Sequence, residues 1–137
     1  IFIKADRIRS IQMKGKAMVD EGIVPEFVAI VNYAIIALIQ LEHGAAQEAD
    51  FNEEQAQAAY DKYAKECLEL MLRKNHDYNE AWRDMRISSY TDFILTKIQR
   101  IKEIEGLDGK TLVSEGIDSN YMDIINYACF GAIKMAE

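Results

Sequence analysis

Carboxylate and amide side chains near the C-terminus have a spacing that could bind a metal ion and a phosphate together. Glu115 and Asp123 lie eight residues apart, a little over two helical turns, so both can face the same direction. Carboxylates at such spacing can hold Mg²⁺ through oxygen and leave coordination positions for water or phosphate. Asn126 and Tyr127 follow Asp123 on the same helix face. We therefore expect Glu115 and Asp123 to be metal ligands, with Asn126 orienting a ligand or a water and Tyr127 contacting the substrate.

Two cations are expected to lie opposite this acidic group. Lys97 and Arg100 are three residues apart on an apolar helical pattern, so they share a face. A Lys–Arg pair facing a metal cluster suits a polyphosphate, because the metal and the fixed cations neutralise its charge from two sides. The alternative is structural: the two cations pair with Glu103, or with Glu115 and Asp123, and have no further role.

Residues 75–90, NHDYNEAWRDMRISSY, place charges, an indole and two phenols between two apolar helical patterns. Asp77 could add a carboxylate to the site, and Tyr78 or Trp82 could stack on a base. The alternative is that the two rings simply plug the end of a helical bundle. On the preceding helix, Glu69 could be a further metal ligand, although an E-x-x-E pair such as Glu66 and Glu69 is usually a solvated face.

The elements that must position these residues are all predicted to be helices. Apolar residues recur at helical spacing, while Gly (7) and Pro (1) are scarce. Asn52 and Gln55 form a capping-box pattern at the start of one helix. The predicted ranges are about 2–13, 25–43 with Pro25 in the first position, 53–74, a short helix over 80–85, a helix capped by Ser89, and one from Asp118 or Ser119 to the C-terminus. We expect one all-α domain over residues 1–137, a helical bundle without a strand.

Three sequence blocks recur in the same order. The pairs are IKADRIRSI (3–11) with TKIQRIKEI (96–104), GKAMVDEGI (15–23) with GKTLVSEGI (109–117), and IVNYAIIALI (30–39) with IINYACFGAI (124–133). They predict an internal duplication of a helix–loop–helix unit, related by a pseudo-twofold axis. Residues 1–43 are the degenerate copy, truncated at its N-terminus, and residues 52–137 the complete one.

The two copies differ where chemistry is expected. Asn126 aligns with Asn32, but Asp123 aligns with Ala29, so the first copy lacks one carboxylate. The site is therefore expected on the second copy. The shared Asn-Tyr pairs could instead hold an interface together. Because the chain begins at Ile1 rather than Met, we expect the natural protein to extend N-terminally.

Charge and composition exclude some classes of partner. A net charge of −7 and a pI of about 4.9 argue against duplex nucleic acid, but not against a small anion bridged by a metal. Cys67 and Cys129 lack metal spacing and fit a reducing cytosol. The apolar run 28–41 is expected to be a buried helix, too short to span a membrane. Apolar surface left by the incomplete first copy favours a homo-oligomer.

Three segments resemble the nucleotide modification associated domain of the first type, a family long listed without a function. They are KNHDYNEAW (74–82), KIQRIK (97–102) and SEGIDSNYMDIINYA (114–128). The positions that match its pattern are Lys97, Arg100, Glu115, Asp123, Asn126 and Tyr127. Asn79 stands where the family usually has Gly, and Ser119 where an acidic residue is common. A more distant likeness is to the all-α nucleoside triphosphate pyrophosphohydrolases of the MazG and dimeric dUTPase kind.

These resemblances imply a Mg²⁺-dependent nucleotide-binding protein that hydrolyses a nucleoside triphosphate phosphoanhydride. The catalytic residues would be Lys97, Arg100 and Asn126, and the metal ligands would be Glu115, Asp123 and Glu69. The residues in contact with the substrate would be Asp77, Tyr78, Trp82 and Tyr127. The alternative is a non-catalytic helical module that binds a nucleotide or a protein, or forms dimers. That alternative predicts a closed network of Asp123 and Glu115 with Lys97 and Arg100, without a cavity.

Overall fold

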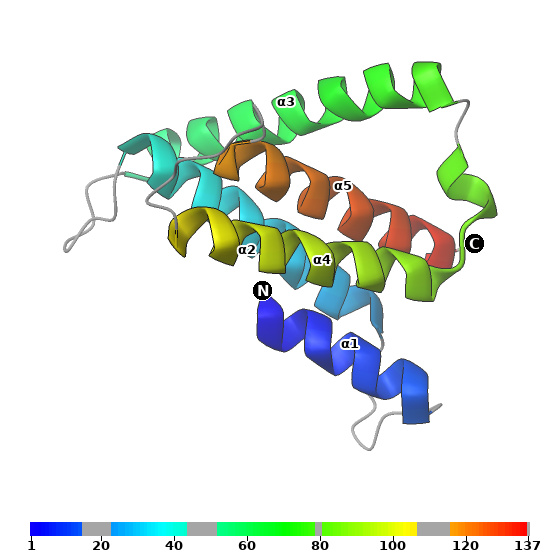
Figure 1. Ribbon diagram of the computed structural model, residues 1–137. Coiled ribbons are helices and arrows are strands. Elements are labelled where there is room, and N and C mark those ends of the chain that lie inside the picture. Colours follow the sequence, from blue (N-terminus) through cyan, green and yellow to red (C-terminus); the bar gives the residue numbers. More distant parts are fainter. Residues whose placement is uncertain (15–22, 44–51, 79–80, 107–115, 137) are drawn as a thin grey trace.

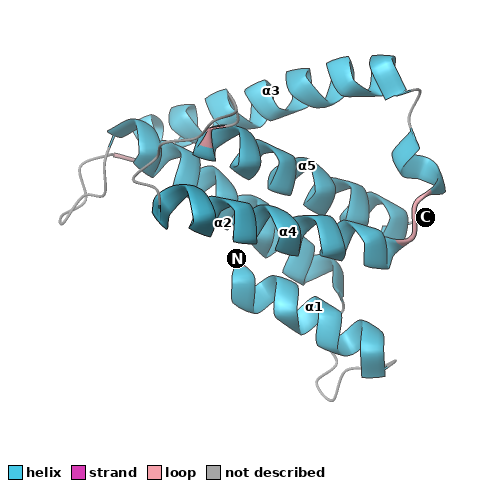
Figure 2. Ribbon diagram, viewed as in Figure 1, coloured by secondary structure: helices cyan, strands magenta, loops and turns pink. Residues whose placement is uncertain are grey.

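Helices make up all the regular structure in the part of the chain that is described. The computed structural model describes residues 1–14, 23–43, 52–78, 81–106 and 116–136, and no strand occurs within them (Figure 2). The elements are α1 (Phe2–Lys14), α2 (Ile23–His43), α3 (Glu53–Tyr78), the 3-10 helix η1 (Ala81–Asp84), α4 (Ile87–Gly106) and α5 (Ile117–Ala136). The predicted all-α bundle is confirmed, while the internal duplication stays a prediction.

Three predicted helix boundaries need correction, and one predicted cap is confirmed. α2 begins at Ile23, so Pro25 is its third residue and not its first. α3 continues to Tyr78, so Asp77 and Tyr78 belong to a helix rather than to the connection after it. α4 begins two residues before Ser89, which is therefore inside the first turn and not its cap. The capping box at α3 is present: the backbone N–H of Gln55 donates to Asn52 Oδ1 at 2.8 Å, and the N–H of Asn52 donates to Gln55 Oε1 at 3.0 Å.

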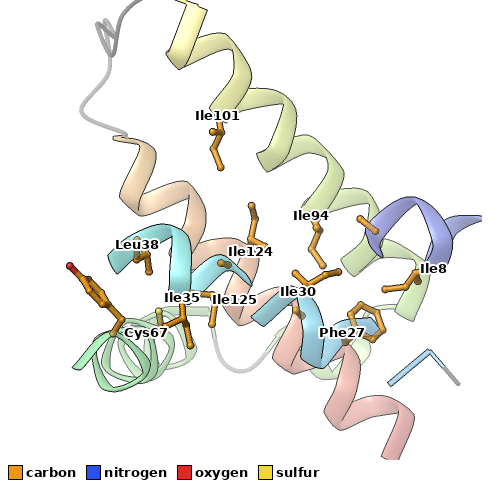
Figure 3. Close-up of a cluster of buried hydrophobic side chains, with 14 residues drawn as sticks. Ile8, Phe27, Ile30, Ile35, Leu38, Cys67, Ile94, Ile101, Ile124 and Ile125 are labelled. Carbon is orange, nitrogen blue, oxygen red and sulfur yellow. The ribbon is translucent and has the colours of Figure 1, made fainter. Parts of the chain in front are cut away.

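The helices pack around the antiparallel pair α2 and α5, which share the most extensive interface (Figure 1). α4 packs on α5, α1 packs on α2 and α4, and α3 crosses the other side of α2 and α5. Their inward residues form one core, which includes Ile8, Phe27, Ile30, Ile35, Leu38, Cys67, Ile94, Ile101, Ile124 and Ile125 (Figure 3). Burial of these side chains is what fixes the relative positions of α3, α4 and α5.

Glycine permits the closest approach between α2 and α5. A Cβ atom added at Gly131 would lie 2.6 Å from Cζ of Phe27, whose ring is fully buried. Any larger residue would therefore push the two central helices apart.

The length argument against a membrane span is wrong for α2. Over Ile23–Glu42 it is the one described helix that is long and apolar enough to cross a membrane by those two criteria. A central helix of a bundle passes the same test, and the inner face of α2 is packed in the core. Its outer face leaves Val28, Tyr33 and Ile36 about half exposed.

Candidate functional site

A cleft of about 390 Å³ opens between the C-terminal half of α3, η1, and one face of α4 and α5. This volume lies within the range of small-molecule sites, roughly 300 to 1,000 Å³. Its lining residues are Met71, Lys74, Asn75, Ala81, Trp82, Met85, Phe93, Lys97, Asp123, Asn126, Tyr127 and Phe130. Five residues that the sequence singled out thus meet here, from η1, α4 and α5: Trp82, Lys97, Asp123, Asn126 and Tyr127.

One side of the cleft holds a carboxylate between two ammonium groups. Lys74 Nζ lies 2.7 Å from Asp123 Oδ1, and Lys97 Nζ lies 3.0 Å from Asp123 Oδ2. The Asp123 side chain is only 14% exposed, so water screens these pairs weakly. Two cations and one anion give the described lining a net charge of one positive unit. Lys74 was not foreseen as a site residue, although it begins the first segment that carries the family resemblance.

Two residues that line the cleft each carry a buried N–H donor without a hydrogen-bond partner among the described residues. Asn126 is 7% exposed and Trp82 is 9% exposed, and neither Asn126 Nδ2 nor Trp82 Nε1 makes a hydrogen bond to the described chain. A buried donor left unpaired costs roughly 1–3 kcal/mol. By contrast, the aligned Asn32 accepts a hydrogen bond from the Tyr60 hydroxyl at 2.8 Å, which ties α2 to α3. The interface interpretation therefore fits Asn32 but leaves Asn126 without an explanation inside the protein.

Aromatic side chains also line the cleft. Trp82 stacks on Phe130 with ring centroids 4.5 Å apart, and the Arg83 guanidinium carbon lies 4.6 Å from the Trp82 ring centroid. A base that stacked on Trp82 would have to displace one of these groups, so the indole face is already occupied. Phe93 stacks on Tyr127 at 5.0 Å and is 41% exposed. This phenylalanine, one turn before Lys97 on α4, is a stacking surface that the sequence analysis missed.

Hydrogen bonds to the backbone hold Trp82 in place. The Tyr90 hydroxyl donates to the Trp82 carbonyl. Lys134 Nζ, from the end of α5, donates to the carbonyls of Arg83 and Met85 at 2.7 Å each. These contacts close the end of the bundle as well as the cleft, so the plugging role proposed for Trp82 is also met.

Other predicted site residues lie elsewhere or cannot be placed. Arg100 does not line the cleft; its Nη1 lies 3.7 Å from Glu103 Oε2, as the structural alternative predicts. Glu69 is exposed and also lies outside the lining. Glu115 lies outside the described residues. Asp77 and Tyr78 end α3, but their side chains are likewise outside the described part.

The described side chains do not fit a Mg²⁺ site. Among the described residues, Asp123 is the one predicted metal ligand that lines the cleft, and each of its oxygens already contacts a lysine. Within residues 1–14, 23–43, 52–78, 81–106 and 116–136, no group of three or more His, Cys, Asp or Glu side chains could hold a metal ion. An ammonium group on each oxygen opposes a second cation by direct repulsion.

The first helix pair has its own ion network, which the alignment did not reveal. Lys4 Nζ lies 3.1 Å from Glu26 Oε2, and Arg7 Nη1 lies 3.1 Å from Glu26 Oε1. Glu26 is 3% exposed and precedes Ala29 by one turn. This network of Glu26 with Lys4 and Arg7 links α1 to α2.

Comparison with protein families gives one assignment. The family model described as nucleotide modification associated domain 1 matches residues 1–41 and 74–135. This match covers most of the chain, so the chain belongs to that family. No curated protein and no solved structure matches it significantly.

Proposed function

We propose that this member of the nucleotide modification associated domain 1 family binds a nucleotide in the cleft. The observation that carries the proposal is the pair of buried N–H donors, on Trp82 and Asn126, without protein partners. Their desolvation is offset if a bound ligand supplies acceptors. The family's description, which refers to nucleotide modification, agrees with a ligand of this class.

The two sides of the cleft divide the ligand between them. Lys74 and Lys97 offer charge-assisted hydrogen bonds to phosphate oxygens. Phe93, stacked on Tyr127, offers an exposed ring to a base, and base–aromatic stacking is worth roughly 1–3 kcal/mol. Asn126 and Trp82 donate to acceptor atoms of the base or sugar. A cleft lined by both cationic and aromatic side chains fits a nucleotide better than a purely apolar ligand.

The rival proposal of a non-catalytic module with a closed ionic network is met only in part. Lys97 does pair with Asp123, and Arg100 with Glu103. The same Asp123 nevertheless borders an open cleft with two unpaired donors, which a closed network would not leave. Nucleotide binding without turnover remains compatible with all these contacts.

Hydrolysis of a phosphoanhydride is the reaction that the sequence resemblance implies, and we keep it as a separate proposal. Glu115 is the residue to test, because the described side chains alone do not provide a Mg²⁺ site. Release of pyrophosphate from each dNTP with Mg²⁺, compared between the wild type and Glu115→Gln, tests it. No release by the wild type would exclude this activity while leaving nucleotide binding untouched. Equal release by the two proteins would exclude a role for Glu115 in it.

Isothermal titration calorimetry tests binding itself. The four dNMPs and four dNTPs are titrated with Mg²⁺ and again with EDTA. Lys97→Met should weaken binding by roughly tenfold or more, because a charge-assisted contact to phosphate is lost. Lys102→Met is the matched control on the same helix, since Lys102 is exposed and outside the cleft. Binding of no nucleotide at millimolar concentration, or equal weakening by both variants, would refute the proposal.

A further inference from the structure

We propose that Asp123 occupies the phosphate position of the cleft as an internal anion, and that a bound nucleotide binds by taking Lys74 and Lys97 away from it. This inference rests on the proposed nucleotide-binding function and states how the same site is regulated. It differs from the role first expected for Asp123, which was to hold a metal.

The positions of the two lysines around Asp123 indicate that its carboxylate competes with a phosphate for them. The two carboxylate oxygens are each used by a different lysine, at 2.7 Å and 3.0 Å. A phosphate oxygen placed at either ammonium group would have to replace a carboxylate oxygen and would lie close to the remaining negative charge. In a site where the carboxylate is 14% exposed, that repulsion is weakly screened. Asp123 should therefore lower the affinity of the cleft for phosphate.

The contact also joins three helices. Lys74 is on α3, Lys97 on α4 and Asp123 on α5, and α3 and α5 otherwise meet over a limited interface. Lys74 is the more exposed of the two lysines, at 47% against 22%, so it is the one more readily drawn to an incoming anion. Ligand binding would replace the link between α3 and α5 through Asp123 by a link through the phosphate.

Replacing Asp123 by Asn gives opposite results under the two roles. If Asp123 competes with phosphate, Asp123→Asn removes the repulsion, keeps the side-chain shape and tightens binding. If Asp123 holds a metal that bridges to phosphate, the same change weakens binding in Mg²⁺ and has little effect in EDTA. The sign of the change in EDTA therefore separates the two.

Calorimetry in EDTA with dAMP, dCMP, dGMP and dTMP, and with the four matching nucleosides, provides the test. Asp123→Asn should bind the monophosphates about tenfold more tightly, while nucleosides, which lack the phosphate, should bind equally to both proteins. Weaker or unchanged monophosphate binding by a folded Asp123→Asn protein would overturn the inference, as would an equal gain for nucleosides. If the wild type and this variant bind none of the eight compounds, the proposed function fails first.

A second variant keeps the test decisive if Asp123→Asn does not fold. Lys74→Met leaves Asp123 paired with Lys97 and reduces the net charge of the described lining to zero. Monophosphate affinity should then fall by about tenfold and nucleoside affinity should not change. Lys65→Met on the same helix, outside the cleft and exposed, should leave both affinities unchanged. Unaltered monophosphate affinity in Lys74→Met would refute the assignment of Lys74 to the phosphate.

Discussion

Asn126→Leu should make the free protein more stable while weakening its ligand binding. Asn126 is 7% exposed, and its Nδ2 donates to no group of the described chain. Leucine has the same number of side-chain heavy atoms with the same branching and no polar atom, so the substitution removes an unpaired donor. If Asn126 serves the structure, the protein should become less stable on this change. If Asn126 serves a ligand, the free protein should become more stable.

The size of the effect follows from burial. An unpaired buried donor costs roughly 1–3 kcal/mol, and refitting a side chain with the same heavy-atom branching costs less than about 1.5 kcal/mol. The expected gain is therefore about 1–2 kcal/mol. For a domain of this size, each kcal/mol raises Tm by about 3–4 °C, so Tm should rise by about 3–8 °C. Affinity for the nucleotides tested above should fall, because a hydrogen bond to the ligand is lost.

Thermal unfolding followed by circular dichroism measures this gain, with Asn120→Leu as the matched control. Asn120 is 1% exposed on the same helix, but its Nδ2 donates to the Gly116 carbonyl at 2.9 Å. There the lost hydrogen bond offsets the removal of its unpaired Oδ1, so the change in stability should stay within about 1 kcal/mol. A lower Tm for Asn126→Leu than for the wild type, or an equal gain in both variants, would refute the argument.

Three further predictions follow from the packing. Gly131→Ala should lower the free energy of unfolding, measured in urea, because overpacking costs about 1–3 kcal/mol and helix propensity returns about 1 kcal/mol. Burial, with smaller effects from Cys129, Glu66 and Asp123, raises the pKa of the Cys67 thiol from 9.0 to about 12. The folded state then holds this proton more tightly, so the stability of the wild type relative to Cys67→Ala should be constant below pH 9 and fall as pH rises toward 12. We also propose that the exposed face of α2 joins two copies of the chain, so Ile36→Glu should reduce the mass measured by light scattering after size exclusion.

Each of these three predictions has a control variant or a result that would contradict it. Gly106→Ala meets no described atom within 4 Å and should change stability little; a loss equal to that of Gly131→Ala would contradict the packing argument. A pH-independent difference between the wild type and Cys67→Ala would mean that the thiol titrates normally. Ile3→Glu, on α1 and 79% exposed, should leave the mass unchanged, and a monomeric wild type would exclude the α2 interface.

Helix identity was readable from the sequence because it depends on local spacing. The apolar period, the Asn52–Gln55 capping box and the scarcity of glycine predicted five long helices, and all five are present among the described residues. Their ends were less readable. α4 starts before Ser89 because the connection from η1 is short, with Ser89 N–H donating to the Arg86 carbonyl at 2.9 Å.

The side-chain types on α4 and α5 also predicted which residues of these two helices lie close together. Lys97 and Asp123 were expected to face one another, and they do, because both helices bury their apolar stripe against the same core and so fix which face is left over. Arg100 was expected beside Lys97 at the site, yet it lies outside the cleft and pairs with Glu103.

The sequence by itself thus determined an all-α bundle of this family and the candidate residues on α4 and α5. Only the tertiary structure decided that α3 contributes Lys74 and that Phe93 is exposed beside Tyr127. It also decided that Asn126 Nδ2 and Trp82 Nε1 have no hydrogen-bond partner among the described residues. The reason is that periodicity records which face of a helix is buried, whereas a cleft depends on the angle and register between helices distant in sequence. That angle is set by the packed core as a whole, through contacts such as Gly131 against Phe27.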